Sequence, residues 1–356
     1  MPNAVVTQAL DRLASREDLS ADEAAEVLAE IMQGEVSETQ IAGFLIALRT
    51  KGETVEELAG LARTMRALAA HVPSERDDLL DTAGTGGGRS TFNVSTTAAL
   101  IAAGAGCAVA KHGNRSATSR SGSADLLEAL GARIDLDPAA VARCIDEAGF
   151  GFMFAPAHHR ATRFVMPVRR ELAVRTIFNL LGPLTNPAGA RRQLIGVSDP
   201  SFLETIAGAL ARLGVDRALI VAGEDGVDEV SIGAATKVVE VNGEQITRYT
   251  LLPGDVGLEL ARDPESERDL RGGTPLHNAA VTQAVLLGEA PAGGRSARSD
   301  LALINAGAAI YTAGRADSIA AGVLAAREAV ADGRAARALE RYLQATLSYA
   351  PVKAGP

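Results

Sequence analysis

Residues 79–96 read LLDTAGTGGGRSTFNVST, and this stretch decides the fold. A short apolar segment leads through a glycine-rich turn at 84–88 into an alanine-rich helix that begins near Ser95. Four more apolar runs alternate with helical patterns, at 107–110, 151–155, 194–197 and 218–222. Such alternation predicts an α/β protein with a mostly parallel central sheet covered by helices. An Asn-Gly pair within 236–252 predicts an additional hairpin.

The N-terminal 70 residues predict a separate bundle of helices. Capping boxes, in which a Ser or Thr and a Glu or Gln bond each other's backbone amides, begin at Ser20, Ser37 and Thr54. Apolar residues follow each box at helical spacing, and Gly34 and Gly52 stand where helices end. We therefore expect a small helical domain over 1–72 and an α/β domain over 73–356. Part of the apolar surface of the bundle is a candidate dimer interface.

The composition excludes several classes of protein. The 356 residues are 47% hydrophobic and 22% charged, which suits a large and a smaller domain with buried cores. Two cysteines and no secretory signal predict a reducing, cytoplasmic compartment without a disulfide framework. No uncharged apolar run is long enough to span a membrane. The net charge of −9 argues against a general nucleic-acid binder.

Two basic islands in this acidic chain favour a local anion site. Residues 111–120 hold three basic residues and no acid, and residues 155–192 hold seven arginines and one acid. An uneven distribution of this kind attracts a small anion. On charge alone, a pair of solvated surfaces explains the islands equally well.

The glycine-rich turn at 84–88 predicts a phosphate or pyrophosphate cradle. Glycine lets backbone N–H groups approach an anion closely, and the following helix N-terminus adds positive potential. The turn lacks the Gly-Lys-Ser/Thr of a P-loop and does not fit the dinucleotide-binding pattern. The alternative is a tight turn in which Ser95 serves only as an N-cap.

Two further motifs complete the candidate site. The segment 111–125, KHGNRSATSRSGSAD, follows a strand at the end where parallel sheets bind ligands, and it is rich in cationic and hydroxyl donors. Alone it is more often surface than site, but paired with the glycine turn it predicts a convergent anion site. Asp228-Glu229 suits a hard cation that keeps waters and bridges phosphates, although a solvated turn is the commoner explanation. His158-His159 is not a metal site, because adjacent helical side chains diverge.

Together these motifs resemble the anthranilate phosphoribosyltransferase family. The resemblance runs from about Ser20 to the C-terminal helices. Its most specific pieces are GTGG at 84–87, NVST at 93–96, the segment 111–125, RTIFNLLGPLTNP from 175 and GVDEVS from 226. It implies a nucleoside phosphorylase/phosphoribosyltransferase-like fold, with a helical domain completed by residues 166–192. It also implies a homodimer that pairs through the N-terminal helices.

The implied activity is transfer of the phosphoribosyl group of phosphoribosyl pyrophosphate (PRPP) to the amino group of anthranilate, in tryptophan biosynthesis. The resemblance implies Mg2+ as cofactor, held by Ser95, Asp228 and Glu229. The expected catalytic residues are Lys111, Asn114 and Arg169, and anthranilate is expected at Gly84, Asn114 and Arg169. The planar guanidinium of Arg169 matches a carboxylate, and Arg170 is the solvated alternative. The residues expected to contact PRPP are Gly84, Gly87, Gly88, Thr91, Asn93, Val94, Ser95, Thr96, Lys111, His112, Gly113, Asn114, Arg115, Ser116, Ala117, Thr118, Ser119 and Ser123.

One departure from the family concerns Gly88. Members commonly carry an acid as the fifth residue of the glycine loop, whereas this chain has Gly88 and a loop one residue shorter before Asn93. A contact from that acid is lost, which leaves the number of magnesium ions open. Two alternatives also remain: a pyrimidine nucleoside phosphorylase on the same scaffold, and a non-catalytic relative that binds nucleic acid. The HGNR and LGPLTNP segments fit anthranilate transfer better than nucleoside phosphorolysis, and the acidic net charge disfavours nucleic-acid binding.

Overall fold

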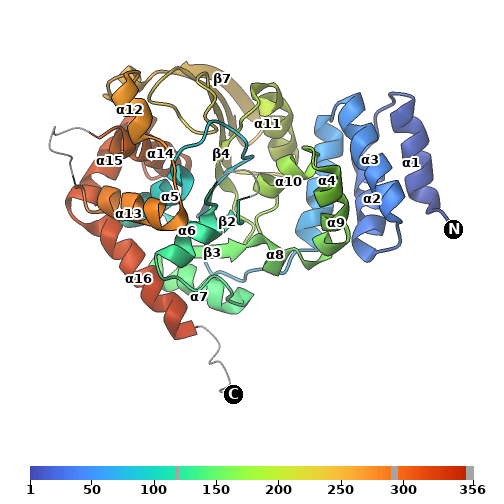
Figure 1. Ribbon diagram of the computed structural model, residues 1–356, viewed down its shortest axis with the longest axis horizontal. Coiled ribbons are helices and arrows are strands. Elements are labelled where there is room, and N and C mark those ends of the chain that lie inside the picture. Colours follow the sequence, from blue (N-terminus) through green and yellow to red (C-terminus); the bar gives the residue numbers. More distant parts are fainter. Residues whose placement is uncertain (117–119, 290–295, 350–356) are drawn as a thin grey trace.

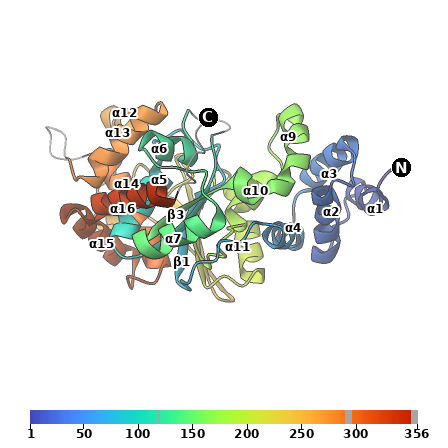
Figure 2. The same cartoon turned by 90° about the horizontal axis from the view of Figure 1, so that it is seen from below.

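A group of helices lies beside a larger α/β body in the computed structural model, which describes residues 1–116, 120–289 and 296–349 (Figure 1). The N-terminal helices are α1 (Ala4–Ala14), α2 (Ala21–Gln33), α3 (Glu38–Lys51) and α4 (Val55–Ala67). They form one end of the elongated molecule, and α9 (Met166–Leu172) contacts α3 there (Figures 1 and 2). The expected fold class, a small helical part beside a large α/β part, is confirmed.

The predicted helix starts are present, with one difference. Complete capping boxes begin α2 at Ser20 and α4 at Thr54. Ser37 also caps α3, but the Gln40 side chain accepts instead from the backbone N–H of Asn3, at 3.0 Å. The box predicted at Ser37 is therefore only half formed, because Gln40 joins α3 to the start of α1.

The sheet has seven strands in the order β3-β2-β1-β4-β5-β6-β7. Five strands are parallel: β1 (Leu79–Gly84), β2 (Ala108–Gly113), β3 (Phe150–Phe154), β4 (Arg192–Gly196) and β5 (Arg217–Gly223). The predicted hairpin forms the antiparallel pair β6 (Thr236–Asn242) and β7 (Gln245–Leu251). The expected mostly parallel sheet is confirmed, and the carboxyl ends of its parallel strands share one edge.

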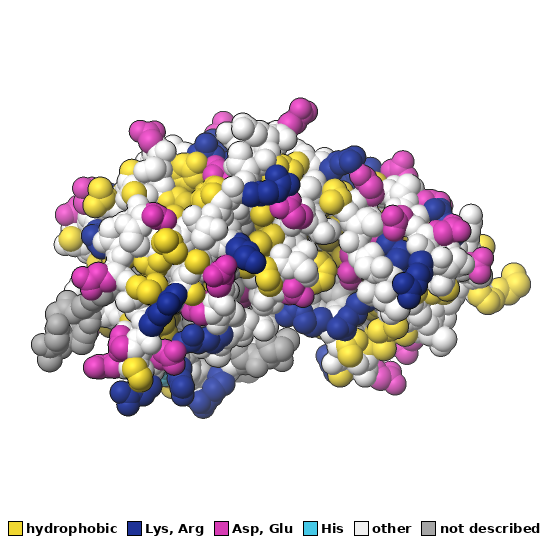
Figure 3. Space-filling model, turned by 90° about the horizontal axis from the view of Figure 1, so that it is seen from above, with side chains coloured by type: hydrophobic (Ala, Val, Ile, Leu, Met, Phe, Trp, Pro, Cys, Tyr) yellow, Lys and Arg dark blue, Asp and Glu magenta, His cyan; other side chains and the backbone are white. Residues whose placement is uncertain are grey.

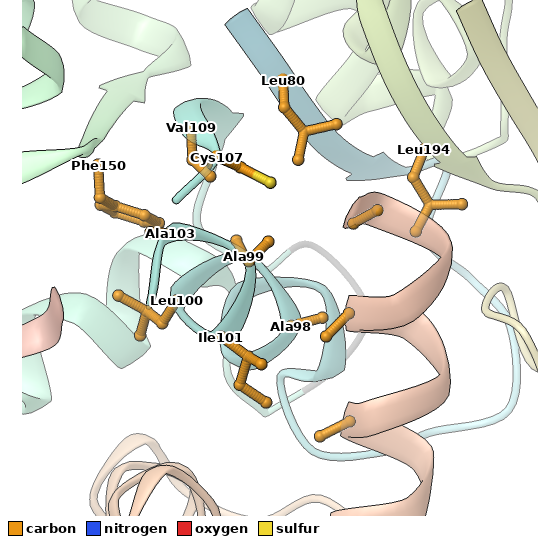
Figure 4. Packing of buried hydrophobic residues seen from close by; sticks show 14 of the residues in the cluster. Leu80, Ala98, Ala99, Leu100, Ile101, Ala103, Cys107, Val109, Phe150 and Leu194 are labelled. Carbon is orange, nitrogen blue, oxygen red and sulfur yellow. The ribbon is translucent and has the colours of Figure 1, made fainter. Parts of the chain in front are cut away.

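Two hydrophobic cores form because successive strand residues face opposite sides of the sheet. On one side Leu80, Leu194 and Leu219 share a core with α5 (Val94–Gly104), which contacts β1, and with α14 (Ala297–Thr312), which contacts β4 and β5. Figure 4 shows Ala99 of α5 on the side of that helix that faces Leu80. On the other side Ile195 and Ile220 join the core of the N-terminal helices. The remaining α-helices are α6 (Ser123–Ala129), α7 (Pro138–Ala148), α8 (Ala155–His158), α10 (Phe178–Leu184), α11 (Leu203–Arg212), α12 (Pro264–Asp269), α13 (Pro275–Leu286), α15 (Ile319–Ala331) and α16 (Arg334–Tyr349).

Short 3-10 turns complete the described chain at Arg160–Phe164, Pro200–Phe202 and Pro253–Val256. The segment 166–192 contributes α9 and α10, which contact α3 and α4 respectively. These contacts agree with the expected grouping, and the residue boundaries of the two domains stay a prediction. None of the helices in the described ranges is long and apolar enough to cross a membrane.

Buried histidines lie where the N-terminal helices meet the α/β body. The segment after α4 and the end of α8 are joined there by a hydrogen bond from the Ala70 N–H to the His158 carbonyl, at 2.8 Å. The His112 and His159 rings lie 5.1 Å apart, and the Nε2 atom of each is buried without a partner in the described structure. Burial lowers the pKa of His112 to about 3 and the pKa of His159 to about 4. Both rings are therefore neutral near neutral pH.

This burial predicts a pH-dependent stability. Below about pH 6.5 the unfolded histidines take up protons, whereas the folded rings stay neutral until the pH approaches 4, so the free energy of unfolding falls as pH falls through this window. His159→Gln should make that decline shallower, and the exposed His277→Gln control should not. Denaturant unfolding at several pH values measures the slopes. Equal slopes for His159→Gln and the wild type would contradict the prediction.

Candidate active site

The three predicted motifs meet at the carboxyl edge of the sheet. The backbone N–H of Gly86 donates to Asp228 Oδ2 at 3.0 Å, and Thr91 Oγ1 donates to Glu229 Oε1 at 3.0 Å. The Lys111 ammonium lies 3.3 Å from Ser95 Oγ. Ser95, Asp228 and Glu229 line the same small pocket. The ends of β1, β2 and β5 thus bring together residues that are far apart in the sequence.

The glycine loop has a shape that requires glycine. Gly86 and Gly87 have φ angles of +65° and +84°, which L side chains rarely adopt. A Cβ atom on Gly88 would lie 2.7 Å from Asp228 Oδ1, so this arrangement leaves no room for the acid common in the family. Among the described residues, the N–H groups of Gly87 and Gly88 have no acceptor. These two amides are therefore free for an anionic ligand.

Helix α5 begins at Val94 with Asn93 as its N-cap residue, so Ser95 lies inside the first turn. The alternative that Ser95 is only an N-cap is wrong. The Asn93 side chain makes no capping bond and instead contacts the second motif, donating to the Ser121 carbonyl at 3.1 Å. Val94 and Thr96 are fully buried, and the Val94 N–H already donates to the Phe92 carbonyl at 2.7 Å. The contacts expected between these two residues and PRPP stay a prediction.

Lys111 lies beneath the pocket rather than in solvent. Its side chain is buried, and Nζ donates to the Thr82 carbonyl at 2.5 Å as well as to Ser95. Burial lowers the pKa of Lys111 to about 8, while the nearby buried Asp81 raises it somewhat. The pKa of Asp81 is itself raised by burial to about 6. At neutral pH a cation therefore stands within hydrogen-bonding distance of Ser95, in a region of low polarity.

His112 follows Lys111 in β2 but makes different contacts. Strand β2 continues to Gly113, so Lys111 and His112 alternate and point to opposite faces of the sheet. The His112 ring lies against the Gly182 carbonyl at 3.1 Å, and its backbone N–H is taken by Asp81. The His112 side chain thus lies on the opposite face of the sheet from Lys111, and its contact with PRPP stays a prediction.

The rest of the second motif is largely paired within itself. Arg115 binds Asp125 at 2.7 Å and also binds Glu128, so its charge is already balanced. Asn114 Oδ1 accepts from the Arg115 N–H, and the Asn114 carbonyl accepts from Ser123 Oγ at 3.2 Å. Gly113 ends β2, where a Cβ atom would overlap Ser123 Oγ, and the Ser116 N–H in the following loop donates to Asp125 Oδ2 at 3.3 Å. The contacts predicted for Ala117, Thr118 and Ser119 lie outside the described residues.

The acidic pair fits a divalent cation that keeps several waters. Glu229 Oε2 is buried without a partner, and burial together with the charge of Asp228 raises the pKa of Glu229 well above its usual value. Burial likewise raises the pKa of Asp228. A bound cation would give the Glu229 oxygen a partner and would stabilise the charged form of both carboxylates. The described chain gathers no cluster of three or more His, Cys, Asp or Glu for a metal, so Ser95 and ligand oxygens would supply the other positions.

Arg169 lies apart from these contacts. It belongs to α9, where its guanidinium lies over the Phe178 ring at 5.3 Å and Nη2 is 3.5 Å from Asn179 Oδ1. In the described structure it forms no ion pair, and burial lowers its pKa. The structure does not bring Arg169 into contact with Gly84 or Asn114, so the expected grouping around anthranilate stays a prediction. Its unpaired cation remains available to a carboxylate.

Four residues of the site region were not predicted: Thr82, Arg175, Gly196 and Ser198. Gly196 ends β4, and a Cβ there would overlap the backbone of Asp228, so glycine is needed for the acidic turn to approach. Ser198 follows two residues later and donates to the Gly86 carbonyl at 2.9 Å. Both residues follow an apolar strand at its carboxyl end, where parallel sheets bind ligands, and this position could have predicted them. Arg175 lies in the basic island 155–192 and begins the RTIFNLLGPLTNP segment, but neither feature assigned it to the site. Thr82 carried no local signal.

Viewed from above, the surface is indented between the larger and the smaller part of the molecule, and Lys and Arg side chains gather along that indentation (Figure 3). A glycine loop and a helix N-terminus lie at one edge of the sheet with a buried lysine and an acid pair, and this combination defines a phosphate-binding protein. Residues 76–336 match the model of the glycosyl transferase family, a/b domain, and residues 7–69 match its helical bundle domain.

Individual relatives make the family assignment narrower. The anthranilate phosphoribosyltransferase of Symbiobacterium thermophilum is 50% identical over 338 residues, covering 95% of this chain and 96% of that protein. The crystal structure of the Thermus thermophilus enzyme of that name has a TM-score of 0.88 at 47% identity, covering 95% of this chain and 99% of the other. The Saccharomyces cerevisiae enzyme, solved with PRPP and Mg, has a TM-score of 0.87 at 28% identity and coverages of 97% and 99%. The chain belongs to the anthranilate phosphoribosyltransferase family.

Proposed function

We propose that this protein transfers the phosphoribosyl group of PRPP to the amino group of anthranilate, giving N-(5-phosphoribosyl)anthranilate and pyrophosphate, in tryptophan biosynthesis. The observation that carries the proposal is the meeting of the glycine loop, the Lys111–Ser95 contact and the Asp228-Glu229 turn in a chain with close relatives of that name. A homodimer through the N-terminal helices and a cytoplasmic location belong to the same proposal. The free, buried Cys107 and Cys144 support the compartment.

In this mechanism the chain positions two substrates and stabilises charge. The free amides of Gly87 and Gly88 and the N-terminus of α5 bind phosphate oxygens. The Lys111 cation stabilises negative charge as pyrophosphate leaves the anomeric carbon. Magnesium at Ser95, Asp228 and Glu229 would neutralise further charge on the diphosphate. Arg169 binds the carboxylate of anthranilate and so positions this substrate. The amine of anthranilate carries the lone pair that attacks the anomeric carbon, so no protein nucleophile is needed.

The direct test follows the fluorescence of anthranilate in the presence of PRPP and magnesium. Fluorescence should disappear with the purified protein, persist when EDTA removes the metal, and disappear again once magnesium is restored in excess. Persistent fluorescence in every arm would contradict the proposal. Phosphorolysis of thymidine or uridine would then identify a nucleoside phosphorylase, and salt-sensitive DNA binding without turnover would identify a nucleic-acid-binding relative.

Arg169→Ala should chiefly raise the KM for anthranilate. A charge-assisted bond to a carboxylate contributes about 1.5–3 kcal/mol, which corresponds to roughly a 10- to 100-fold change. Arg170→Ala is the matched control, because Arg170 is the exposed neighbour on the same helix and carries the same charge. Steady-state kinetics with each substrate varied separately measure the effect. An increase confined to the KM for PRPP would contradict the role assigned to Arg169.

A further inference from the structure

Arg175 reaches the glycine loop from the segment between α9 and α10. Its Nη1 donates to the carbonyl of Gly86 at 2.7 Å, although the two residues are 89 positions apart in the chain. Its own carbonyl accepts from Arg49 Nη1 of α3 at 2.6 Å. The residue thus connects the N-terminal helices with the loop that is proposed to hold the diphosphate. No carboxylate of the described residues forms an ion pair with its guanidinium.

The same carbonyl has a second donor. Ser198 Oγ donates to the Gly86 oxygen at 2.9 Å, so two side chains from different segments fix one peptide plane. The described chain contains no cis peptide bond, and in a trans peptide the C=O and the following N–H point in opposite directions. The Gly87 N–H is therefore directed away from Arg175 and Ser198. It has no acceptor among the described residues.

The loop and the arginine are also fitted to each other sterically. A Cβ atom on Gly87 would overlap Arg175 Nη1, and Gly87 has a φ of +84°. Glycine at this position thus permits both the backbone conformation and the approach of the guanidinium. A carbonyl held by two donors leaves the adjacent amide preorganised, so it loses little freedom when an anion binds.

From this geometry we infer that Arg175 is a further substrate-positioning residue, which together with Ser198 aims the Gly87 amide at the diphosphate of PRPP. The inference rests on the proposed function and adds a residue to the same site. Because the Arg175 guanidinium donates to the glycine loop, we expect its replacement to weaken binding of the diphosphate. Because Arg49 holds its backbone, Arg175 also makes the order of the loop depend on the position of the N-terminal helices.

The test compares Arg175→Ala with the wild type by calorimetric binding of magnesium pyrophosphate and by kinetics with each substrate varied. We expect the Kd for pyrophosphate and the KM for PRPP to rise about tenfold, as for the loss of about 1.4 kcal/mol, while the KM for anthranilate stays unchanged. Arg175→Lys should restore part of the affinity through one donor. Ser198→Ala should weaken pyrophosphate binding to a smaller degree, and Arg170→Ala should leave it unchanged.

Unchanged pyrophosphate affinity in Arg175→Ala would overturn the inference, as would an effect confined to anthranilate. A merely structural role would also overturn the inference. It would be indicated by a lowered Tm, an equal rise in the KM for PRPP and the KM for anthranilate, and no recovery in Arg175→Lys. The outcome is separable from that of the proposed function. A wild-type protein without transferase turnover would refute the proposed function, whereas pyrophosphate binding by the wild type and Arg175→Ala still decides the role of Arg175.

Discussion

Replacing Lys111 by methionine is expected to lower kcat by on the order of 10²–10³-fold, the loss typical of removing a donor that stabilises charge in a transition state. The ammonium is buried and lies 3.3 Å from Ser95 Oγ, beneath the proposed diphosphate site. In such a poorly polar region a single charge acts far more strongly than in water. Methionine keeps the length and apolar stem of the side chain while removing that charge.

Lys237→Met is the matched control, because Lys237 is exposed on β6. Thermal unfolding checks that Lys111→Met is folded, since the change leaves the Thr82 carbonyl without its donor. A second readout is the pH profile: because burial lowers the pKa of Lys111 to about 8, wild-type kcat should decline as the pH rises through that value. Wild-type turnover by folded Lys111→Met would exclude Lys111 from the mechanism.

Asp228→Asn should reduce kcat/KM for PRPP by on the order of 10²-fold or more, because the change removes a carboxylate from the proposed magnesium site. Asparagine retains an oxygen that can accept from the Gly86 N–H, so the glycine loop keeps its contact with the turn. The expected loss therefore reports on the charge of Asp228 rather than on the loop. Calorimetric binding of magnesium pyrophosphate should weaken in parallel.

Asp216→Asn is the control for this change. Asp216 directly precedes β5, at the opposite edge of the sheet, and is paired there with Arg191 at 2.8 Å. It carries the same charge change without contact with the pocket. Equal losses in Asp216→Asn and Asp228→Asn would indicate a general effect on the protein, and an unaffected Asp228→Asn would remove the acid pair from the metal site.

The fold was predictable because its determinants are local. The strand, glycine turn and helix at 79–96 follow one another in the chain, and the Asn-Gly turn sets the hairpin of β6 and β7. The meeting of the three motifs was also predictable, because parallel strands end at one edge. One error had a local cause: ending the second strand at Ala110 hid the alternation that turns His112 away from Lys111.

The other differences come from contacts between distant segments. Gln40 accepts from the Asn3 N–H instead of completing the capping box at Ser37. Arg175 donates to Gly86, which lies 89 positions earlier in the chain. Arg115 looked free for a phosphate, yet α6 presents Asp125 and Glu128 to it. Such pairings depend on how helices and loops pack in three dimensions, and no periodicity or motif in the sequence encodes them.

The most direct test of the central claim is a crystal structure of the protein with PRPP and Mn2+ in place of Mg2+, in which anomalous scattering locates the metal. The account predicts the diphosphate on the amides of Gly87 and Gly88, with the metal between it and Ser95, Asp228 and Glu229. A diphosphate bound elsewhere, or a metal site away from the acid pair, would contradict the account.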